Sequence, residues 1–170
     1  MREGEQLVAL AGLHELLHGH AIDYWLFGGW AVDFHVGQVT RSHDDLDLAV
    51  WADDRDRIHT LLRAEGWNHA PEPGEDGYTG YVRGRVRLEL AFLARDEDGE
   101  VYTPLRDGRG TWPSKSFESS LAELRGIRVR IVSLDALRRD KADVRDDAIV
   151  AAKDRADSQA LAAADQRPTA

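Results

Sequence analysis

Residues 25–50, "WLFGGWAVDFHVGQVTRSHDDLDLAV", contain the pattern from which we infer the fold. This stretch begins inside a short apolar run, "YWLF" (residues 24–27), which predicts a buried strand and stops at Gly28-Gly29. The residues that follow repeat apolar side chains at helical spacing and end at Gly37, a residue type that commonly terminates helices. The predicted order is therefore strand, double glycine, short helix.

The end of this stretch, "RSHDDLDLAV" (residues 41–50), predicts a second strand over Leu46–Trp51. With the period of two that a strand imposes, Asp45 and Asp47 share one face, and Leu46, Leu48 and Val50 share the other. Two like charges on one strand face repel each other, and the repulsion grows as water is excluded. A positive group is therefore expected between the two carboxylates.

A third acid, Glu89, projects from a separate predicted strand, "RVRLELAFL" (residues 85–93). Carboxylates are the ligands that magnesium prefers, and a further carboxylate can complete a metal site or accept a proton from an attacking hydroxyl group. The two glycines let backbone N–H groups approach phosphates at a helix N-terminus, and Arg41 supplies a nearby positive charge. Taken singly, each feature also fits a plain turn or a solvent-facing side chain, but together they indicate a magnesium–nucleotide complex.

Helices are predicted at both ends of the chain and strands in the middle. The helices cover residues 6–20, 30–36, 53–65, 134–141 and 146–164, with Ser133 as the N-cap of the fourth. Further strands cover residues 78–83 and 126–133, whereas residues 101–113 are predicted to be mostly irregular. This order indicates an α+β fold, with a small mixed β-sheet core flanked by helices over residues 1–132 and a short helical C-terminal part over residues 133–170.

The composition excludes several classes of function. No apolar run approaches the length of about 18 residues that spans a membrane, and no cysteine is present for a disulfide, a thiolate zinc site or a nucleophile. A formal charge of −9 disfavours a general nucleic-acid binder and suits a cationic small substrate, although acidity alone is common in soluble proteins. The N-terminus lacks the pattern of a signal peptide, so a cytoplasmic protein is expected.

Residues 25–50 closely resemble the signature of DNA-polymerase-beta-like nucleotidyltransferases. Within that family they resemble the antibiotic-modifying branch, the aminoglycoside 2″-nucleotidyltransferases and lincosamide nucleotidyltransferases, which carry W-L-x-G-G-W-x-x-D and then T/Q-R-x-H-x-D-h-D with h apolar. The matching positions are Trp25, Leu26, Gly28, Gly29, Trp30, Asp33, Thr40, Arg41, His43, Asp45 and Asp47. Asp44 is the additional acid of the aminoglycoside-like version, and Glu89 stands where an aspartate is more usual.

The resemblance implies a magnesium-dependent transfer of a nucleoside monophosphate, in particular AMP from ATP, to a drug hydroxyl group with release of pyrophosphate. Asp45, Asp47 and Glu89 would bind two magnesium ions, and Glu89 would act as a metal ligand or as the general base. The residues implied to contact the nucleotide are Gly28, Gly29, Arg41, Lys141 and Lys153. We interpret His43 and Asp33 as structural residues that brace the motif, and Trp25 and Trp30 as core residues.

The acceptor and the assembly stay open. An aminoglycoside-like polycation is favoured over a lincosamide because of the net charge, Asp44 and the acidic loops "PEPGED" (residues 71–76) and "DEDGE" (residues 96–100). A nucleotidyltransferase-fold antitoxin or other partner-binding module is a second class, but such proteins usually carry G-S in place of Gly28-Gly29. A catalytically silent relative is disfavoured by the three acids. A monomer or a homodimer fits, and no nucleic-acid or membrane partner is expected.

Overall fold

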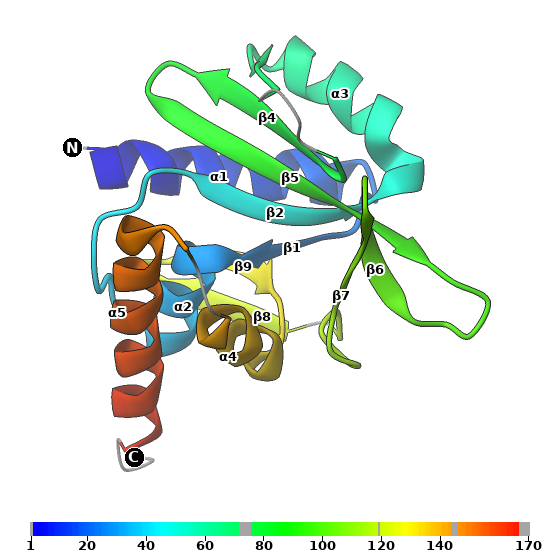
Figure 1. Cartoon of the computed structure of the whole chain (residues 1–170). Helices are drawn as coiled ribbons and strands as arrows, with labels where there is room; N and C mark the ends of the chain where they lie inside the picture. The colour runs from blue at the N-terminus through cyan, green and yellow to red at the C-terminus, as the bar shows by residue number, and fades with distance from the viewer. Residues whose placement is uncertain (1, 72–75, 119, 144–145, 167–170) are drawn as a thin grey trace.

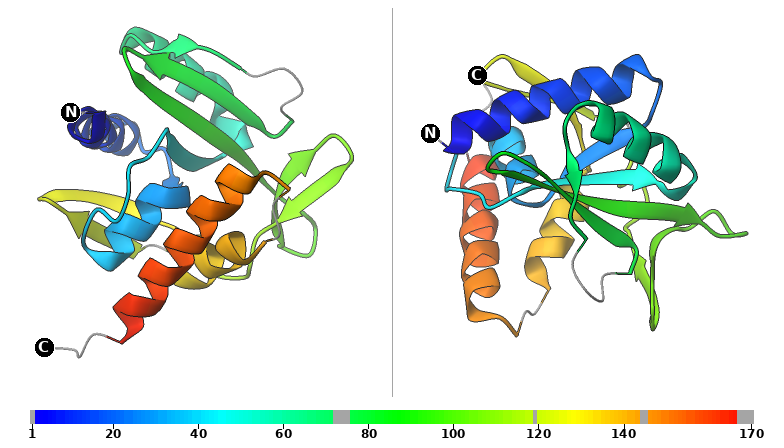
Figure 2. Two further views of the ribbon diagram at one scale, coloured as in Figure 1. Left: turned by 60° about the vertical axis from the view of Figure 1, so that its left-hand side comes forward. Right: turned by 90° about the horizontal axis from the view of Figure 1, so that it is seen from above.

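A computed structural model describes residues 2–71, 76–118, 120–143 and 146–166 and shows a mixed β-sheet between two layers of helices (Figures 1 and 2). The helices are α1 (Arg2–Gly19), α2 (Gly28–Val36), the 3₁₀ turn η1 (Ala52–Asp54), α3 (Arg55–Ala64), α4 (Leu134–Ala142) and α5 (Ala148–Asp165). The strands are β1 (Tyr24–Phe27), β2 (Leu46–Trp51), β3 (Asn68–His69), β4 (Tyr78–Arg83), β5 (Val86–Arg95), β6 (Val101–Leu105), β7 (Gly108–Thr111), β8 (Ser120–Leu124) and β9 (Ile127–Ile131). The predicted α+β class is confirmed.

The sheet places the strands that carry the candidate residues at its centre. Its strands follow the order β3-β4-β5-β2-β1-β9-β8, and the β6–β7 hairpin continues from the end of β5. Strand β2 runs parallel to β5 and antiparallel to β1, while β1 runs parallel to β9. Because β1, β2 and β5 each have a hydrogen-bonded neighbour on both sides, residues on these strands hold fixed positions relative to one another.

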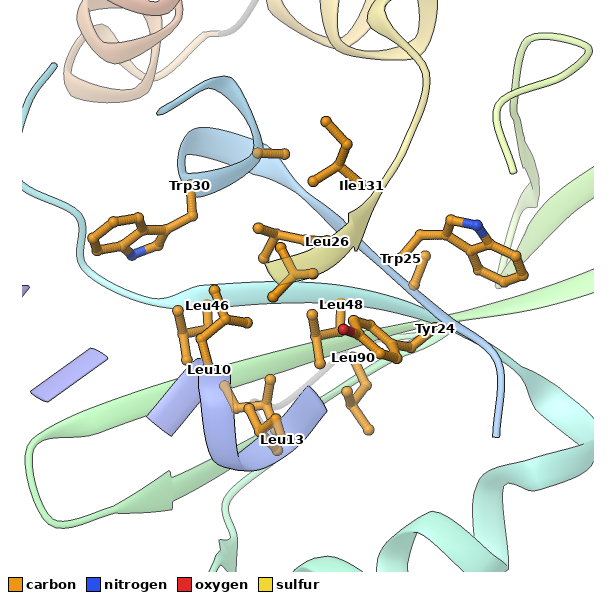
Figure 3. Packing of buried hydrophobic residues seen from close by; sticks show 14 of the residues in the cluster. Leu10, Leu13, Tyr24, Trp25, Leu26, Trp30, Leu46, Leu48, Leu90 and Ile131 are labelled. Atoms are coloured by element: carbon orange, nitrogen blue, oxygen red, sulfur yellow. The ribbon is translucent and has the colours of Figure 1, made fainter. Parts of the chain in front are cut away.

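Two helical layers cover the two faces of the sheet: α1 and α3 lie on one face, and α2, α4 and α5 lie on the other (Figure 2). Leu10 and Leu13 of α1 pack against Leu46 and Leu48 of β2, and all four are buried (Figure 3). Burying such a side chain contributes about 1.5–3 kcal/mol. Since side chains alternate along a strand, this packing turns Asp47 toward the opposite face, where α2 begins.

The two tryptophans of the motif belong to the core, as the sequence predicted. Trp25 is 4% exposed and Trp30 is 1% exposed. The Trp25 ring makes edge contacts with Trp51 and Phe117, and the Trp30 ring centroid lies 4.5 Å from that of His43. Both rings therefore pack within the core and do not form a surface for a substrate.

The prediction that residues 101–113 are mostly irregular is wrong. They contain strands β6 and β7, which pair with each other as a hairpin, with Thr103 opposite Gly110. Pro104 and the glycines of "RDGRG" (residues 106–110) interrupt the alternation of apolar and polar residues that marks a strand. Pro104 is tolerated because β6 and β7 form a small outlying ribbon, where a missing backbone donor is less costly than in a central strand.

Strand β8 had no counterpart among the strands predicted from the sequence. It pairs with β9 through a tight turn at Arg125-Gly126, whose φ angles are 51° and 78°. Hairpin turns with two positive φ angles normally carry Asn, Asp or Gly at both positions. An arginine at the first position removes that signal, so the hairpin leaves no recognisable pattern in the sequence.

The helices differ from their predicted bounds mainly at their starts. Helix α1 begins at Arg2 rather than at residue 6, and the predicted helix over residues 53–65 divides into η1 and α3. The N-cap prediction for Ser133 is confirmed, since its Oγ accepts a hydrogen bond of 3.3 Å from the Ala136 N–H group. Among the described residues, no helix combines the length and apolar character needed to cross a lipid bilayer.

The C-terminal helices α4 and α5 pack against α2 and against each other (Figure 1). The predicted division of the chain after residue 132 stays a prediction. Of the predicted loop over residues 71–77, residues 72–75 lie outside the described part of the chain.

Candidate active site

Three carboxylates lie in one region of the fold, where α2, β2 and β5 come together. In the parallel pairing of β2 with β5, Asp47 lies beside Glu89, so both side chains share one face of the sheet. In the antiparallel pairing of β1 with β2, Asp47 lies opposite Phe27, the residue that precedes Gly28-Gly29. Asp45 comes directly before β2. The register thus brings the acids and the double glycine to one place.

Gly28 makes room for the carboxylate of Asp47. Its φ angle is +68°, and a Cβ atom built on it would lie 2.9 Å from Cγ of Asp47 and closer still to Oδ2. An L-residue at this position would meet both a strained backbone conformation and a collision with the carboxylate. The glycine therefore allows Asp47 to rest against the first turn of α2.

The environment of Asp47 disfavours its charged form. Burial raises the pKa of Asp47 well above its usual value, and the charges of Asp45 and Glu89 raise it further, while Lys141 acts in the opposite direction. A divalent cation would relieve this repulsion, since it favours the ionised form of every carboxylate near it. The residues present therefore fit a bound magnesium ion.

Asp45 and Glu89 also line one small hollow of about 20 Å³, together with Gly80 and Tyr81 of β4. Within the described residues, no three His, Asp or Glu side chains converge as a finished metal site. A magnesium ion at these acids would complete its shell with phosphate oxygens and water, as this ion commonly does.

Gly29 lets Arg41 and His43 approach the start of α2. A Cβ atom on Gly29 would lie 2.5 Å from Nδ1 and 2.8 Å from Cε1 of His43, and it would also collide with Nη2 of Arg41. The first backbone N–H groups of a helix have no partner inside the helix and carry a partial positive charge. Both glycines thus lie at a position suited to an anion, with the guanidinium group of Arg41 beside it.

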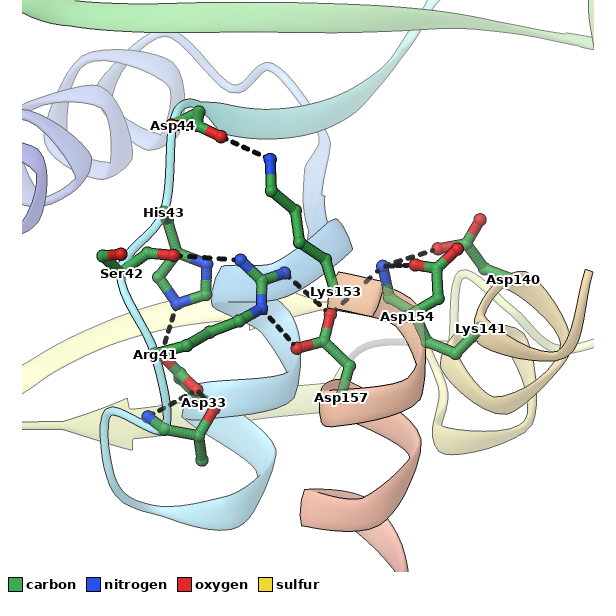
Figure 4. A network of polar contacts seen from close by, with 11 residues as sticks. Asp33, Arg41, Ser42, His43, Asp44, Asp140, Lys141, Lys153, Asp154 and Asp157 are labelled. Atoms are coloured by element: carbon green, nitrogen blue, oxygen red, sulfur yellow. Dashed lines mark hydrogen bonds and ion pairs between the residues drawn. The ribbon is translucent and has the colours of Figure 1, made fainter. Parts of the chain in front are cut away.

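Asp33 organises the loop that leads into β2. Its side chain is fully buried; Oδ1 accepts hydrogen bonds from the Thr40 N–H group (3.0 Å) and the Thr40 hydroxyl, and Oδ2 lies 2.5 Å from Nε2 of His43 (Figure 4). These contacts agree with the interpretation of Asp33 and His43 as structural residues. They hold the loop in a single shape and so set the position of Asp45 and Asp47.

Arg41 forms a fork-shaped ion pair with Asp157 of α5. Nε lies 2.7 Å from Oδ1, Nη2 lies 2.8 Å from Oδ2, and Nη1 donates a 3.0 Å hydrogen bond to the Ser42 carbonyl (Figure 4). Burial alone would lower the pKa of Arg41 and raise that of Asp157, but their contact reverses both effects and favours the two charged forms. The pair joins the loop before β2 to the last helix.

The two predicted lysines also contact acids. Nζ of Lys141 lies 3.1 Å from Asp154, 3.2 Å from Asp140 and 3.3 Å from Asp157, and Lys153 pairs with Asp44 (Figure 4). The three cations predicted to contact phosphate therefore lie in the loop before β2 (Arg41), in α4 (Lys141) and in α5 (Lys153), and each is paired with an acid. Their role toward a nucleotide stays a prediction.

Sequence reasoning missed Asp154 and Asp157, the two buried acids of α5. Their spacing of three residues in "AAKDRADSQAL" (residues 151–161) puts both on one face of an alanine-rich helix, together with the buried Leu161. Charged residues on the apolar face of a helix are uncommon unless they are paired, so this pattern was the available signal.

A cleft of about 180 Å³ borders the site. Phe27, Tyr78 and Trp112 provide aromatic walls. The charged lining consists of Arg139 and Asp140 of α4 and of Asp143, which follows that helix. Phe27 lies opposite Asp47 in the sheet, so the cleft opens next to the carboxylates.

Comparison with known sequences points to one family. The family model described as aminoglycoside-2''-adenylyltransferase matches residues 9–161, most of the chain. A 2''-aminoglycoside nucleotidyltransferase of Escherichia coli is 40% identical over 42 residues, which are 25% of this chain and 24% of that protein, and one of Klebsiella pneumoniae matches equally. The aligned segment therefore spans about a quarter of the length of these curated relatives.

Solved structures share the fold. The lincosamide antibiotic adenylyltransferase LnuA, solved with lincomycin bound, has a TM-score of 0.68 at 18% identity, covering 88% of this chain and 92% of that chain. ANT(2")-Ia in complex with adenylyl-2"-tobramycin has a TM-score of 0.65 at 20% identity, covering 96% of this chain and 95% of that chain.

Proposed function

The chain belongs to the aminoglycoside-2''-adenylyltransferase family, and we propose that it transfers AMP from ATP to a hydroxyl group of an aminoglycoside-type antibiotic, releasing pyrophosphate. The observation that carries this proposal is the packing of Asp47 against Gly28, with Asp45 and Glu89 close enough to raise its pKa. Phosphoryl transfer needs such a concentration of carboxylates next to an anion site.

Each of the candidate side chains has its own proposed role in the reaction. Asp45 and Asp47, with Glu89 as a third candidate ligand, would hold magnesium, which supplies positive charge to the phosphate oxygens when it is bound. The start of α2 at Gly28-Gly29 receives the triphosphate, with Arg41 beside it and Lys141 and Lys153 as further candidates. The polar network around α5 supports these roles. It holds Arg41 and Lys141 on Asp157, and it holds Lys153 on Asp44, the residue before Asp45.

Glu89 has a second proposed role, that of the general base. The acceptor oxygen forms a bond to the α-phosphorus, the bond from that phosphorus to the bridging oxygen of the pyrophosphate breaks, and pyrophosphate leaves with the electron pair. The hydroxyl proton passes to the Glu89 carboxylate, which faces the same side of the sheet as Asp47.

The cleft beside Phe27 is the proposed place of the acceptor. Its acids, Asp140 and Asp143, outnumber its one cation, Arg139, and would hold a multiply charged amine by charge-assisted hydrogen bonds. Its aromatic walls suit a sugar ring. The net charge of −9 favours the same class of acceptor. A cytoplasmic location fits a reaction that uses ATP. The proposed assembly is a monomer or a homodimer.

A panel experiment tests the proposed function. The protein is incubated with magnesium, each of the four common nucleoside triphosphates, and either aminoglycosides or lincosamides, and pyrophosphate is measured. We expect release with ATP and a kanamycin-type drug. Release that needs a lincosamide would move the assignment to the other branch, and no release with any combination would refute nucleotidyl transfer.

Nucleotide binding is expected to depend on magnesium. Two or three carboxylates give too few ligands for a closed site, so metal and triphosphate should complete each other's coordination. Calorimetry with a non-hydrolysable ATP analogue should show binding at least about tenfold tighter with magnesium than with a chelator, a difference of about 1.4 kcal/mol. Equal affinity in the chelator would contradict the proposed metal role.

Acceptor binding is expected to weaken with salt. Charges at an exposed cleft are screened beyond about 8–10 Å at physiological ionic strength, so the KM of a kanamycin-type drug should rise markedly between low and high salt. A lincosamide, with one amine and an apolar tail, provides the matched comparison and should respond little. A KM for the aminoglycoside that does not change with salt would contradict electrostatic recognition.

A further inference from the structure

Asp157 of α5 is a buried acid that the proposed reaction does not use. Its side chain is 0% exposed, yet its carboxylate contacts two cations, each from a different segment of the chain. Oδ1 and Oδ2 accept the fork of Arg41 at 2.7 and 2.8 Å, and Oδ2 lies 3.3 Å from Nζ of Lys141. One carboxylate on the last helix thus joins the loop before β2 to α4.

The fork fixes the direction of the guanidinium group. A guanidinium group has five N–H donors, and Asp157 and the Ser42 carbonyl take three of those of Arg41. Nη2 lies so close to the place that a Cβ atom on Gly29 would take that the two would collide, so this edge of the group rests against the first turn of α2. The second N–H donor of Nη2 is therefore held at the helix terminus, where an anion is favoured.

Lys141 is held on the other side of Asp157. Its side chain is 8% exposed and contacts Asp154 and Asp140 as well as Asp157. Asp140 lines the cleft with Phe27, the residue directly before Gly28-Gly29. Asp157 thus has one cation at the helix terminus and a second toward the cleft.

Stability alone is a weak reason for this arrangement. Removing charges from water is costly, and well-packed apolar residues often replace a buried ion pair without loss of stability. A buried carboxylate that fixes a cation in one orientation lowers the entropy cost of ordering that cation when an anionic ligand binds.

We propose that Asp157 is a positioning residue for the nucleotide: it holds Arg41 beside the first turn of α2 and Lys141 on its other side, so that the triphosphate meets cations already in place. This inference rests on the proposed function. It gives α5 a part in nucleotide binding and no part in acceptor binding. The opposite possibility, in which Asp157 competes with phosphate for the same cations, predicts tighter nucleotide binding once the acid is neutralised.

Asp157→Asn tests the proposal, because the amide keeps the shape of the side chain and loses its charge. We expect the KM for ATP to rise about tenfold or more, as for the loss of a hydrogen bond between charged groups, while kcat and the KM for the drug change by less than about threefold. Calorimetry with the magnesium complex of a non-hydrolysable ATP analogue should show the same loss of affinity. A loss of folded protein would lower kcat without changing either KM.

Asp165→Asn is the matched control. Asp165 ends the same helix and pairs with Arg138, but both side chains are about half exposed, at 48% and 46%. This variant should bind ATP and turn it over like the wild type, because exposed ion pairs contribute little.

A double variant shows whether Asp157 acts through Arg41. If it does, Arg41→Ala with Asp157→Asn should bind the analogue no more than about threefold more weakly than Arg41→Ala alone. If Asp157→Asn does not fold, Arg41→Lys serves instead, since it keeps the charge and loses the fork; its KM for ATP should rise.

The outcomes distinguish failure of the positioning role from failure of the proposed function. An unchanged or lower KM for ATP in folded Asp157→Asn, or an unchanged KM in Arg41→Lys, overturns the positioning role while transfer by the wild type still supports the function. A wild type that transfers nothing refutes the proposed function, and the calorimetric comparison then still decides whether Asp157 supports ATP binding.

Discussion

Asp47→Asn is expected to lose nucleotidyl transfer by about a thousandfold or more while keeping the fold, since a metal-centred charge supplies several kcal/mol to such reactions. The amide retains the shape that fits against Gly28 but removes the charge that would hold the metal. Initial rates with ATP and a kanamycin-type drug check this directly. Activity within about tenfold of the wild type, a difference of about 1.4 kcal/mol, would show that Asp47 has no metal role.

The same substitution should leave stability unchanged or increase it. Burial and the neighbouring acids raise the pKa of Asp47 in the folded state, so the folded protein holds this proton more tightly than the unfolded chain does. Wild-type stability is then lost as the pH rises from the unfolded pKa through the folded pKa. Without metal, Asp47→Asn should therefore melt at an equal or higher temperature near neutral pH, and its advantage should shrink in mild acid. A marked fall in Tm at neutral pH would contradict this.

Gly28→Ala is expected to lower transfer at least about a hundredfold, because displacing a reacting group by about 1 Å has effects of that size. The new Cβ atom would lie 2.9 Å from Cγ of Asp47, so the carboxylate must move from its place against α2. Stability should fall as well, since the φ angle of +68° costs an L-residue about 1–2 kcal/mol. Rates and thermal unfolding measure the two effects separately.

Gly37→Ala is the control for backbone strain. Gly37 has a φ angle of +79°, and no atom lies within 4 Å of the place that a Cβ atom would take, so alanine there meets the strain without the collision. We expect it to lose stability comparably and to keep most of its transfer activity. If both variants lost transfer equally, strain rather than the displacement of Asp47 would be the cause.

The sequence predicted best those features that a local pattern encodes. Strands β1 and β2 have the bounds predicted from their apolar runs, and Ser133 caps α4 as expected. The period of two along β2 correctly separated Asp47 from the apolar face. The β6–β7 hairpin and β8 were missed because Pro104 and Arg125 do not resemble strand or turn residues, and only pairing with distant segments makes their conformations favourable.

The residues of the candidate site were proposed from the sequence, but their contacts could not be predicted from it. That Glu89 lies beside Asp47 depends on the parallel pairing of β2 with β5, which no local pattern records. The glycines were expected to expose backbone to phosphates, and the structure adds that they make room for Asp47 and Arg41. The pairing of Arg41 with Asp157 spans 116 positions in the sequence and could not be predicted from spacing. The catalytic and nucleotide-binding roles themselves remain predictions.

The most direct test of nucleotidyl transfer is the mass of a kanamycin-type drug after incubation with the protein, ATP and magnesium. We predict a drug heavier by one AMP group, with an equal amount of pyrophosphate released, and an unchanged drug when Asp47→Asn replaces the wild type. An aminoglycoside and a lincosamide that both keep their original mass with every nucleoside triphosphate would contradict the proposed function.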